Sequence, residues 1–241
     1  MLGEKGDFMN HTDVRRLFTH LVWLILVLGS AALAQLEVGD RLFDEGDYAA
    51  AAAAYQEAAA DGDGVALYKL ADAKVYQASR TEGETAEKLY NEAVAAAKEA
   101  VEVVPDDLEA HMSLVRAWGR LAQYQGIFES LNLATLMKNE LDLILERDPE
   151  HDGALHALAL WHLNVPWLLG GRSDKTRGLF EQAIAVEPTV LHHLEYGESL
   201  LELGDLAAAK TQLQAALALP AETAAERDEQ ARAQALLKSS F

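Results

Sequence analysis

The chain contains no cysteine among its 241 residues, and only five residues are proline. The absence of cysteine excludes disulfide frameworks, zinc sites with thiolate ligands and cysteine nucleophiles. Four of the prolines, Pro105, Pro149, Pro188 and Pro220, each follow a helical pattern rather than interrupt one. Alternating runs of β-branched residues are also scarce, whereas alanine, leucine and glutamate are frequent. These features favour an all-α protein.

Basic residues are few. The chain has 20 lysines and arginines against 39 aspartates and glutamates, which gives a formal net charge of −19. Such a charge repels phosphate groups, so we do not expect binding to nucleic acid or to an anionic lipid surface. We expect any partner to be neutral, cationic or held by apolar surface.

One long apolar run stands near the N-terminus. Residues 11–34, "HTDVRRLFTHLVWLILVLGSAALA", combine two arginines, an apolar stretch and a small-residue ending, which is the layout of a secretory signal peptide. The stretch is shorter than the ~20 apolar residues of a membrane-spanning helix. We therefore predict a signal peptide over residues 1–34, with Met9 as the more ordinary start. The remaining domain, residues 35–241, is expected to be periplasmic or secreted and without a membrane span. The alternative is an uncleaved N-terminal membrane anchor.

Two distant segments match position by position. They are "VGDRLFDEGDYAAAAAAYQEAAA" from Val38 and "YGESLLELGDLAAAKTQLQAALA" from Tyr196. Each has a glycine in a first helix, a Gly-Asp turn and a large residue between small ones in a second helix. The glycines are Gly39 and Gly197, the turns are Gly46-Asp47 and Gly204-Asp205, and the large residues are Tyr55 and Leu213. Such spacing predicts helical hairpins in which the glycine lets the second helix approach closely.

This pattern resembles the tetratricopeptide repeat. The second-helix endings "KEAVEVVP", "ELDLILERDP" and "LFEQAIAVEP" indicate further, more degenerate units between the two clear ones. The resemblance implies a right-handed superhelix of about five antiparallel hairpins. A polar C-terminal helix, from Glu222 to Leu237, would cap the stack. Thr81 with Glu84 and Thr223 with Glu226 have the spacing of helix-capping boxes.

The C-terminal half also resembles the regulator of microtubule dynamics family and its bacterial relatives. The shared features lie between Ala154 and Leu237: a helix that ends near "PW", then "FEQAIAVEP", the shortened ending "ALALP" and an acidic tail helix. The similarity extends weakly to residues 109–127. A second resemblance, through "P-x-x-LGG", is to the T component of TRAP transporters. That resemblance implies an accessory role in solute uptake.

The loop "PWLLGGRSDK", from Pro166 to Lys175, lacks the glycine and lysine spacing of a phosphate-binding loop. We instead expect a tight reversal at Gly170-Gly171, followed by a helix that Ser173 caps. Trp167 and Leu168 are expected to anchor this joint against the stack.

No catalytic or metal-binding pattern is present in the sequence. His151 and His156 are five residues apart, which places them on different helix faces, and no HExxH occurs. Asp61 and Asp63 lack the glutamate of a calcium loop, because Leu70 stands at that position. We therefore predict no catalytic residues, no metal and no cofactor.

First-helix side chains of such an array face its concave side. The predicted partner-binding groove comprises Phe43, Met112, Arg116, Arg120, Trp161 and Glu198. Two arginine forks on one face suit a carboxylate of a peptide or a small acid. The alternatives are that the arginines pair with acids of the chain such as Glu109 or Glu129, and that Trp161 belongs to the core.

The sequence thus predicts an exported, non-enzymatic scaffold that binds a peptide or protein partner in a concave groove. The alternative is a transporter accessory that binds a small anionic ligand or a periplasmic binding protein. The oligomeric state is left open.

Overall fold

The computed structural model of the chain describes residues 32–241, apart from the side chains of residues 61 and 127–129. The predicted signal peptide therefore lies almost wholly outside the described residues. Residues 32–45 are helical, so the described part of this first helix includes Ala34 and Gln35, which flank the predicted cleavage point. Over residues 32–241, no helix is both long enough and apolar enough to cross a membrane.

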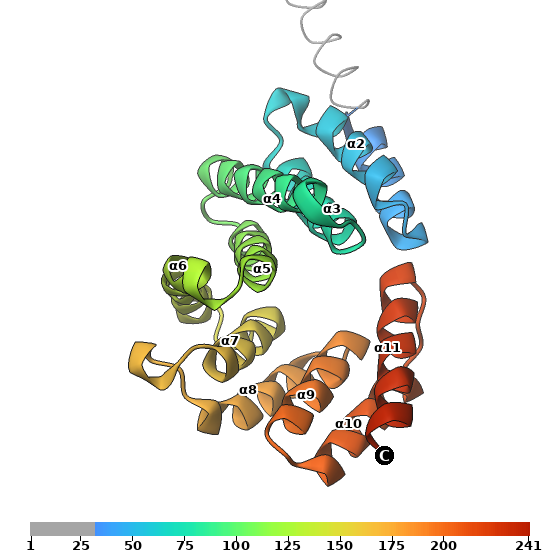
Figure 1. Cartoon of the computed structure of the whole chain (residues 1–241). Coiled ribbons are helices and arrows are strands. Elements are labelled where there is room, and N and C mark those ends of the chain that lie inside the picture. Colours follow the sequence, from blue (N-terminus) through green and yellow to red (C-terminus); the bar gives the residue numbers. More distant parts are fainter. Residues whose placement is uncertain (1–31) are drawn as a thin grey trace, which may run out of the picture.

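Helices make up the described chain, and residues 32–241 contain no strand (Figure 1). After the first helix come α2 (Tyr48–Ala58), a short 3-10 turn (Ala59–Asp61), α3 (Gly64–Ser79), α4 (Gly83–Val103), α5 (Leu108–Gln125) and α6 (Ile127–Arg147). The second half contains α7 (Asp152–Asn164), a 3-10 turn (Trp167–Leu169), α8 (Ser173–Val186), α9 (Val190–Glu202), α10 (Leu206–Ala218) and α11 (Ala224–Ser240).

These helices pair into the five predicted hairpins. The first helix pairs with α2, and then α3 with α4, α5 with α6, α7 with α8 and α9 with α10. First helices also contact one another along the array, α3 with α5, α5 with α7 and α7 with α9. Figure 1 shows α5, α7 and α9 on the inner side of a curve, with α6, α8 and α10 outside. The all-α hairpin superhelix expected from the sequence is confirmed.

The two glycines of the clear repeats allow the close helix approach that their spacing predicts. A Cβ atom on Gly39 would lie 2.4 Å from Cε1 of Tyr55, and one on Gly197 would lie 2.8 Å from Cδ2 of Leu213. Tyr55 is 3% exposed and Leu213 is fully buried, so neither side chain has room to retreat.

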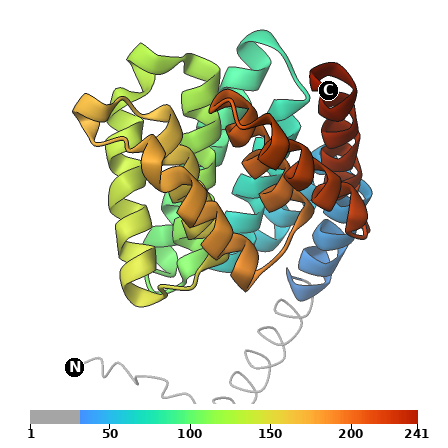
Figure 2. The same cartoon turned by 90° about the horizontal axis from the view of Figure 1, so that it is seen from below.

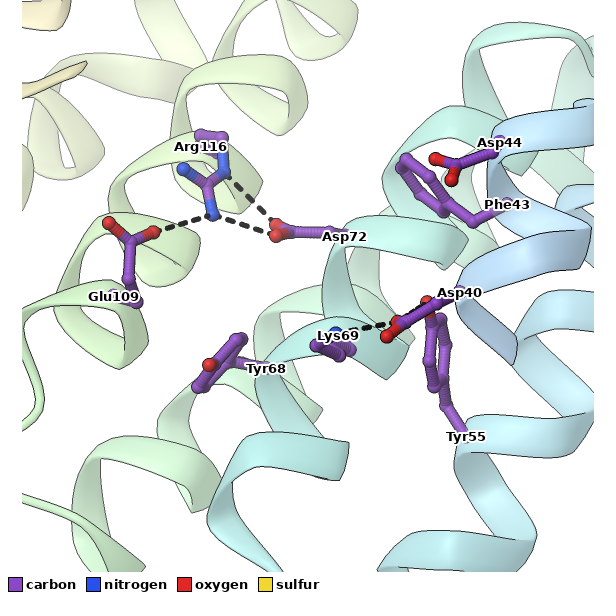
Figure 3. Close-up of a pocket in the computed structure, with 9 residues that line it drawn as sticks. All are labelled: Asp40, Phe43, Asp44, Tyr55, Tyr68, Lys69, Asp72, Glu109 and Arg116. Carbon is purple, nitrogen blue, oxygen red and sulfur yellow. Dashed lines mark hydrogen bonds and ion pairs between the residues drawn. The ribbon is translucent and has the colours of Figure 1, made fainter. Parts of the chain in front are cut away.

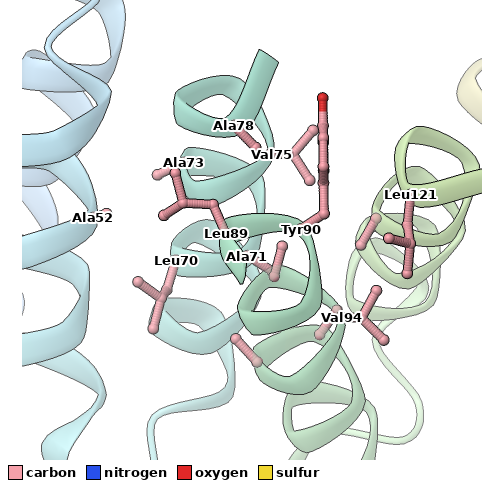
Figure 4. Close-up of a cluster of buried hydrophobic side chains, with 14 of the residues drawn as sticks. Ala52, Leu70, Ala71, Ala73, Val75, Ala78, Leu89, Tyr90, Val94 and Leu121 are labelled. Carbon is pink, nitrogen blue, oxygen red and sulfur yellow. The ribbon is translucent and has the colours of Figure 1, made fainter. Parts of the chain in front are cut away.

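Small residues elsewhere in the core have the same role. Figure 4 shows Leu89 and Tyr90 of α4 packed among alanines of α3, with Leu121 of α5 nearby. Alanines therefore set the helix spacing, and the larger side chains fill what remains.

Turn chemistry explains where several helices begin. Gly46 has φ +87° and Gly204 has φ +80°, and the aspartate that follows each glycine accepts a hydrogen bond from the backbone of the next helix. Thr223 forms the predicted capping box with Glu226. The capping box predicted at Thr81 is wrong. Helix α4 begins later, at Gly83, and its N-cap residue makes no side-chain hydrogen bond.

The loop between α7 and α8 is a tight reversal, as predicted. Gly170 has φ +99°, and a Cβ atom on Gly171 would lie 1.6 Å from the carbonyl oxygen of Val165. Two expectations about this loop are wrong. Trp167 and Leu168 are 78% and 74% exposed rather than packed on the stack. Ser173 is the first helical residue, not the cap.

The capping helix α11 packs on α9 and α10, as expected, and its first residue, Ala224, also lies against Gly46 in the turn of the first hairpin. Arg80, at the end of α3, forms an ion pair with Asp228 of α11. The same guanidinium donates to the carbonyl oxygen of Gly46 over 3.1 Å and lies 4.4 Å from the ring centroid of Tyr48. Figures 1 and 2 both show α11 beside the N-terminal helices. This contact, which the sequence did not predict, brings the two ends of the array together.

The fit at Gly197 yields a prediction. Gly197→Ala should lower the free energy of unfolding by about 1–3 kcal/mol, because overpacking against Leu213 outweighs the gain of about 1 kcal/mol in helix propensity. Gly178→Ala is the matched control, since this exposed glycine lies within α8 and its Cβ position is open. Denaturant unfolding followed by circular dichroism measures both. Equal effects of the two substitutions would contradict the packing account.

Candidate partner-binding site

The Arg116 side chain, on α5, is held by acids of the chain. Its Nη2 atom lies 2.7 Å from Oδ2 of Asp72 and its Nε atom lies 3.1 Å from Oδ1, so the fork is bidentate (Figure 3). Glu109 lies 3.7 Å away. Burial alone would lower the pKa of Arg116, but Asp72 and Glu109 raise it. Glu109 is one of the two partners foreseen as an alternative, whereas Asp72, the principal one, was not foreseen.

Arg120, one turn further along α5, is also paired. Its Nη2 atom lies 3.2 Å from Oε1 of Glu195 on α9, and Nε2 of His156 on α7 lies 2.6 Å from the other carboxylate oxygen. Burial would raise the pKa of Glu195, but the hydrogen bond from His156 and the charge of Arg120 lower it to about 2. This buried cluster joins three inner helices, and it leaves Arg120 no free fork for a ligand.

Glu198, the third charged residue predicted for the groove, is bound to the capping helix. Oε1 of Glu198 lies 2.6 Å from Nε of Arg232 on α11. Burial raises the pKa of Glu198, although the nearby Arg232 opposes this shift. The carboxylate therefore ties α9 to α11.

Two of the predicted groove residues belong to the core instead, and their assignment to the groove is wrong. Met112 is 3% exposed and Trp161 is 7% exposed, and both pack in one cluster with Leu141 and Ile144 of α6. The indole Nε1 atom of Trp161 donates to the carbonyl oxygen of Ala134 over 2.7 Å. Both side chains point toward the second helix of the third hairpin, away from the inner side.

A pocket of about 370 Å³ opens between the first helix, α3 and α5, with Tyr55 of α2 at its side (Figure 3). Phe43 and Arg116, both predicted for the groove, line it. The complete lining is Asp40, Phe43, Asp44, Tyr55, Tyr68, Lys69, Asp72, Glu109 and Arg116. The nine residues include four carboxylates and two cationic groups, so the pocket has an acidic surplus.

One side of the pocket is a small polar network. Oδ1 of Asp40 accepts hydrogen bonds from the hydroxyl of Tyr55 over 2.7 Å and from Nζ of Lys69 over 2.5 Å. The Lys69 ammonium also lies 5.9 Å from the centroid of the Tyr55 ring. Burial and the hydrogen bond to Asp40 raise the pKa of Tyr55. The tyrosine therefore stays a neutral donor, and the lysine is held between a carboxylate and an aromatic face.

The other side is less completely paired. Asp44 is exposed, and the described part of the chain supplies it with no ion pair or hydrogen bond. Burial raises the pKa of Tyr68, and the charges of Asp107, Glu109 and Asp72 add to this effect. The shift is caused mainly by burial, and the three carboxylates act in the same direction.

The sequence pattern indicated only some of the residues that line this pocket. Phe43 was assigned to the concave side from the first repeat, whose match to the repeat pattern is clear. Lys69 and Asp72 belong to α3, whose sequence lacks the repeat glycine. The sequence therefore did not indicate whether their side chains lie on the concave side of the array. Within the described residues, no group of three or more histidine, aspartate or glutamate side chains is arranged to hold a metal ion.

The hairpin array defines a tetratricopeptide-repeat protein. The solved structure of a thermophilic TPR protein in Thermus thermophilus is similar to it, with a TM-score of 0.69 and 25% sequence identity, over 86% of this chain and 100% of that one. A family model for regulator of microtubule dynamics protein 1-3 matches residues 35–168. The chain belongs to this family.

Two curated relatives carry the same family name. The chain is 26% identical to regulator of microtubule dynamics protein 1 of Bos taurus, over 84% of this chain and 70% of the relative. It is also 26% identical to the Pongo abelii protein of that name, over 73% of this chain and 62% of the relative. The family model covers the first part of the domain, whereas the resemblance read from the sequence rested mainly on residues after Ala154.

Glu229 yields a prediction about pH. This α11 residue has its pKa raised to about 7 by burial and by Glu195 and Glu226, against Arg120 and Arg232. Between the ordinary value of 4.5 and about 7, the folded protein keeps a proton that the unfolded chain has lost, so stability falls as pH rises through this window.

Glu229→Gln should therefore melt at a higher temperature than the unaltered protein at about pH 8, and this gain should disappear below about pH 4.5. Glu202→Gln, at an exposed position of α9, removes the same charge and is the control. Melting temperatures measured across this pH range test the prediction. A gain that does not vary with pH, or one shared by the control, would count against it.

Proposed function

We propose that the chain is a non-enzymatic scaffold that binds a peptide or protein partner on its concave face, with the acidic pocket as part of the contact surface. Arrays of helical hairpins typically use their concave surfaces in this way. The observation that carries the proposal is the open pocket between the first helix, α3 and α5, where the inner face remains accessible. The relatives are named for microtubule dynamics, but we do not assign microtubules as the partner.

The alternative, a transporter accessory that binds a small anionic ligand, is less well supported by the geometry. An anion would need a free cationic fork. Arg116, Arg120 and Lys69 each already contact a carboxylate of the chain. A ligand carboxylate would have to displace these contacts and leave a partly buried acid unpaired, which is costly.

A photo-crosslinking experiment tests the scaffold role. A benzophenone side chain in place of Tyr68, within the pocket, should crosslink a defined protein partner in extracts of the source cells. The same group in place of Val186, which is 44% exposed on α8, should not crosslink that partner, because α8 lies on the outer side. Mass spectrometry of the crosslinked products identifies the partner. Identical products at the two positions, or none at Tyr68, would argue against binding at the concave face.

We further propose that the domain acts after export, on the basis of the signal-like N-terminal sequence. If the whole chain is expressed in a bacterium, the periplasmic or secreted fraction should contain a protein whose N-terminal residue is Gln35. Intact-mass measurement and N-terminal sequencing check this. A chain that keeps its N-terminus and sediments with membranes would support the anchor instead, and an unprocessed chain in the cytoplasm would contradict export.

A further inference from the structure

We propose that the pocket receives a lysine or arginine side chain from a basic segment of the partner. This inference rests on the proposed scaffold function and names the chemistry of the partner that the scaffold recognises. Two observations support it. Aromatic faces and carboxylates line the same cavity, and Lys69 is already bound there by a carboxylate and an aromatic ring.

The first argument is the balance of charge inside the pocket. Asp40 and Asp72 are paired with Lys69 and Arg116 respectively. These two pairs use both cationic groups of the lining, so Asp44 remains without a cationic partner among the described residues. Glu109 lies 3.7 Å from Arg116 and 3.5 Å from His151, and both groups lower its pKa. Asp44 is therefore the acid of the lining that most lacks a partner. An incoming cation would complete the pairing.

The second argument is the set of aromatic walls. Phe43, Tyr55 and Tyr68 all line the pocket, and Figure 3 shows Tyr68 on the side of Glu109 and Phe43 on the side of Asp44. Aromatic faces attract ammonium and guanidinium groups, and they also pack against the long alkyl stems of these side chains. The unpaired acid Asp44 thus has an aromatic ring on its side of the pocket.

The third argument is the position of Lys69 itself. Its ammonium lies between the Asp40 carboxylate and the face of the Tyr55 ring. The pocket therefore already holds one cation of the chain by the combination proposed for the ligand. Asp44 with Phe43 repeats that combination without a cation.

Size and long-range charge agree with this assignment. The volume of about 370 Å³ suits a long side chain with some adjoining backbone rather than a folded surface. The net charge of −19 would also draw a basic segment toward the protein. That general attraction acts over the whole surface, so the test must separate it from binding in the pocket.

The probe is a short acetylated and amidated peptide that contains arginine and lysine. Two matched peptides replace these residues with citrulline and norleucine, or with glutamate. Isothermal titration calorimetry at an ionic strength of about 0.15 M, where long-range attraction is screened, measures each affinity. The basic peptide should bind with one site per chain, and the neutral and acidic peptides should bind much more weakly. Equal affinity for the neutral peptide, or tighter binding of the acidic one, would overturn the proposal.

Variants of the protein localise the binding. Asp44→Asn should weaken binding of the basic peptide by about two- to five-fold, as expected for one exposed ion pair. Tyr68→Leu keeps the apolar volume but removes the ring face, and it should weaken binding by about three-fold or more. Glu99→Gln, at an exposed position on α4, removes one charge outside the pocket and should leave the affinity unchanged. Melting temperatures confirm that each variant is folded.

The outcomes separate this inference from the scaffold proposal. If Glu99→Gln weakens binding as much as Asp44→Asn, the attraction is diffuse and the pocket assignment is overturned. If a partner crosslinks at Tyr68 and its capture is insensitive to Asp44→Asn, the scaffold role stands and the cation site fails. If no partner crosslinks at the pocket, the scaffold role fails, whatever the peptide affinity.

Discussion

The arrangement of the inner helices depends on neutralising charge where those helices converge. Side chains on the concave side of a superhelix are crowded and partly removed from water, so a charge there is costly unless an opposite charge lies beside it. Asp40 with Lys69, Asp72 with Arg116, and Glu195 with Arg120 and His156 satisfy this requirement in turn. Each contact joins two different helices, so the pairing also fixes how the hairpins are placed relative to one another.

The pocket lies at the end of this series, where the pairing is incomplete. Between α5 and α9, the acid Glu195 has two partners, and Glu198 is covered by Arg232 of α11. Beside the first helix, acids outnumber the cations that could pair with them. The same interactions that hold the array together thus leave one region of the inner face with unsatisfied negative charge, and the proposed function depends on that region.

The sequence predicted the packing features that depend on contacts between helices of one hairpin. Gly39 with Tyr55 and Gly197 with Leu213 each lie within one hairpin, so their packing could be inferred from spacing alone. The ion-pair partners of the arginines could not be inferred in this way. Asp72 is 44 residues from Arg116, and Glu195 is 75 residues from Arg120, so their proximity depends on the curvature of the whole array.

The errors have the same origin. Met112 was assigned to the groove together with Arg116, but the rotation of about 40° between these two positions is enough to turn Met112 against Leu141 and Ile144 of α6. Trp161 is a first-helix residue of α7 that also packs against α6.

In the loop that follows α7, the reversal at Gly170 could be predicted from local backbone preferences. Whether Trp167 would find a surface to pack on depended on helices that the local sequence does not specify.

The contact between Arg80 and Asp228 joins residues that are 148 positions apart. A ribosome synthesises the first hairpin long before α11 exists, so the hairpins can form from local contacts while this long-range contact waits for the last segment of the chain. Until α11 docks, Glu198 lacks its partner Arg232, and Glu195 is not yet faced by Glu229. Completion of the C-terminal helix is therefore the step that gives the concave face its final electrostatic character.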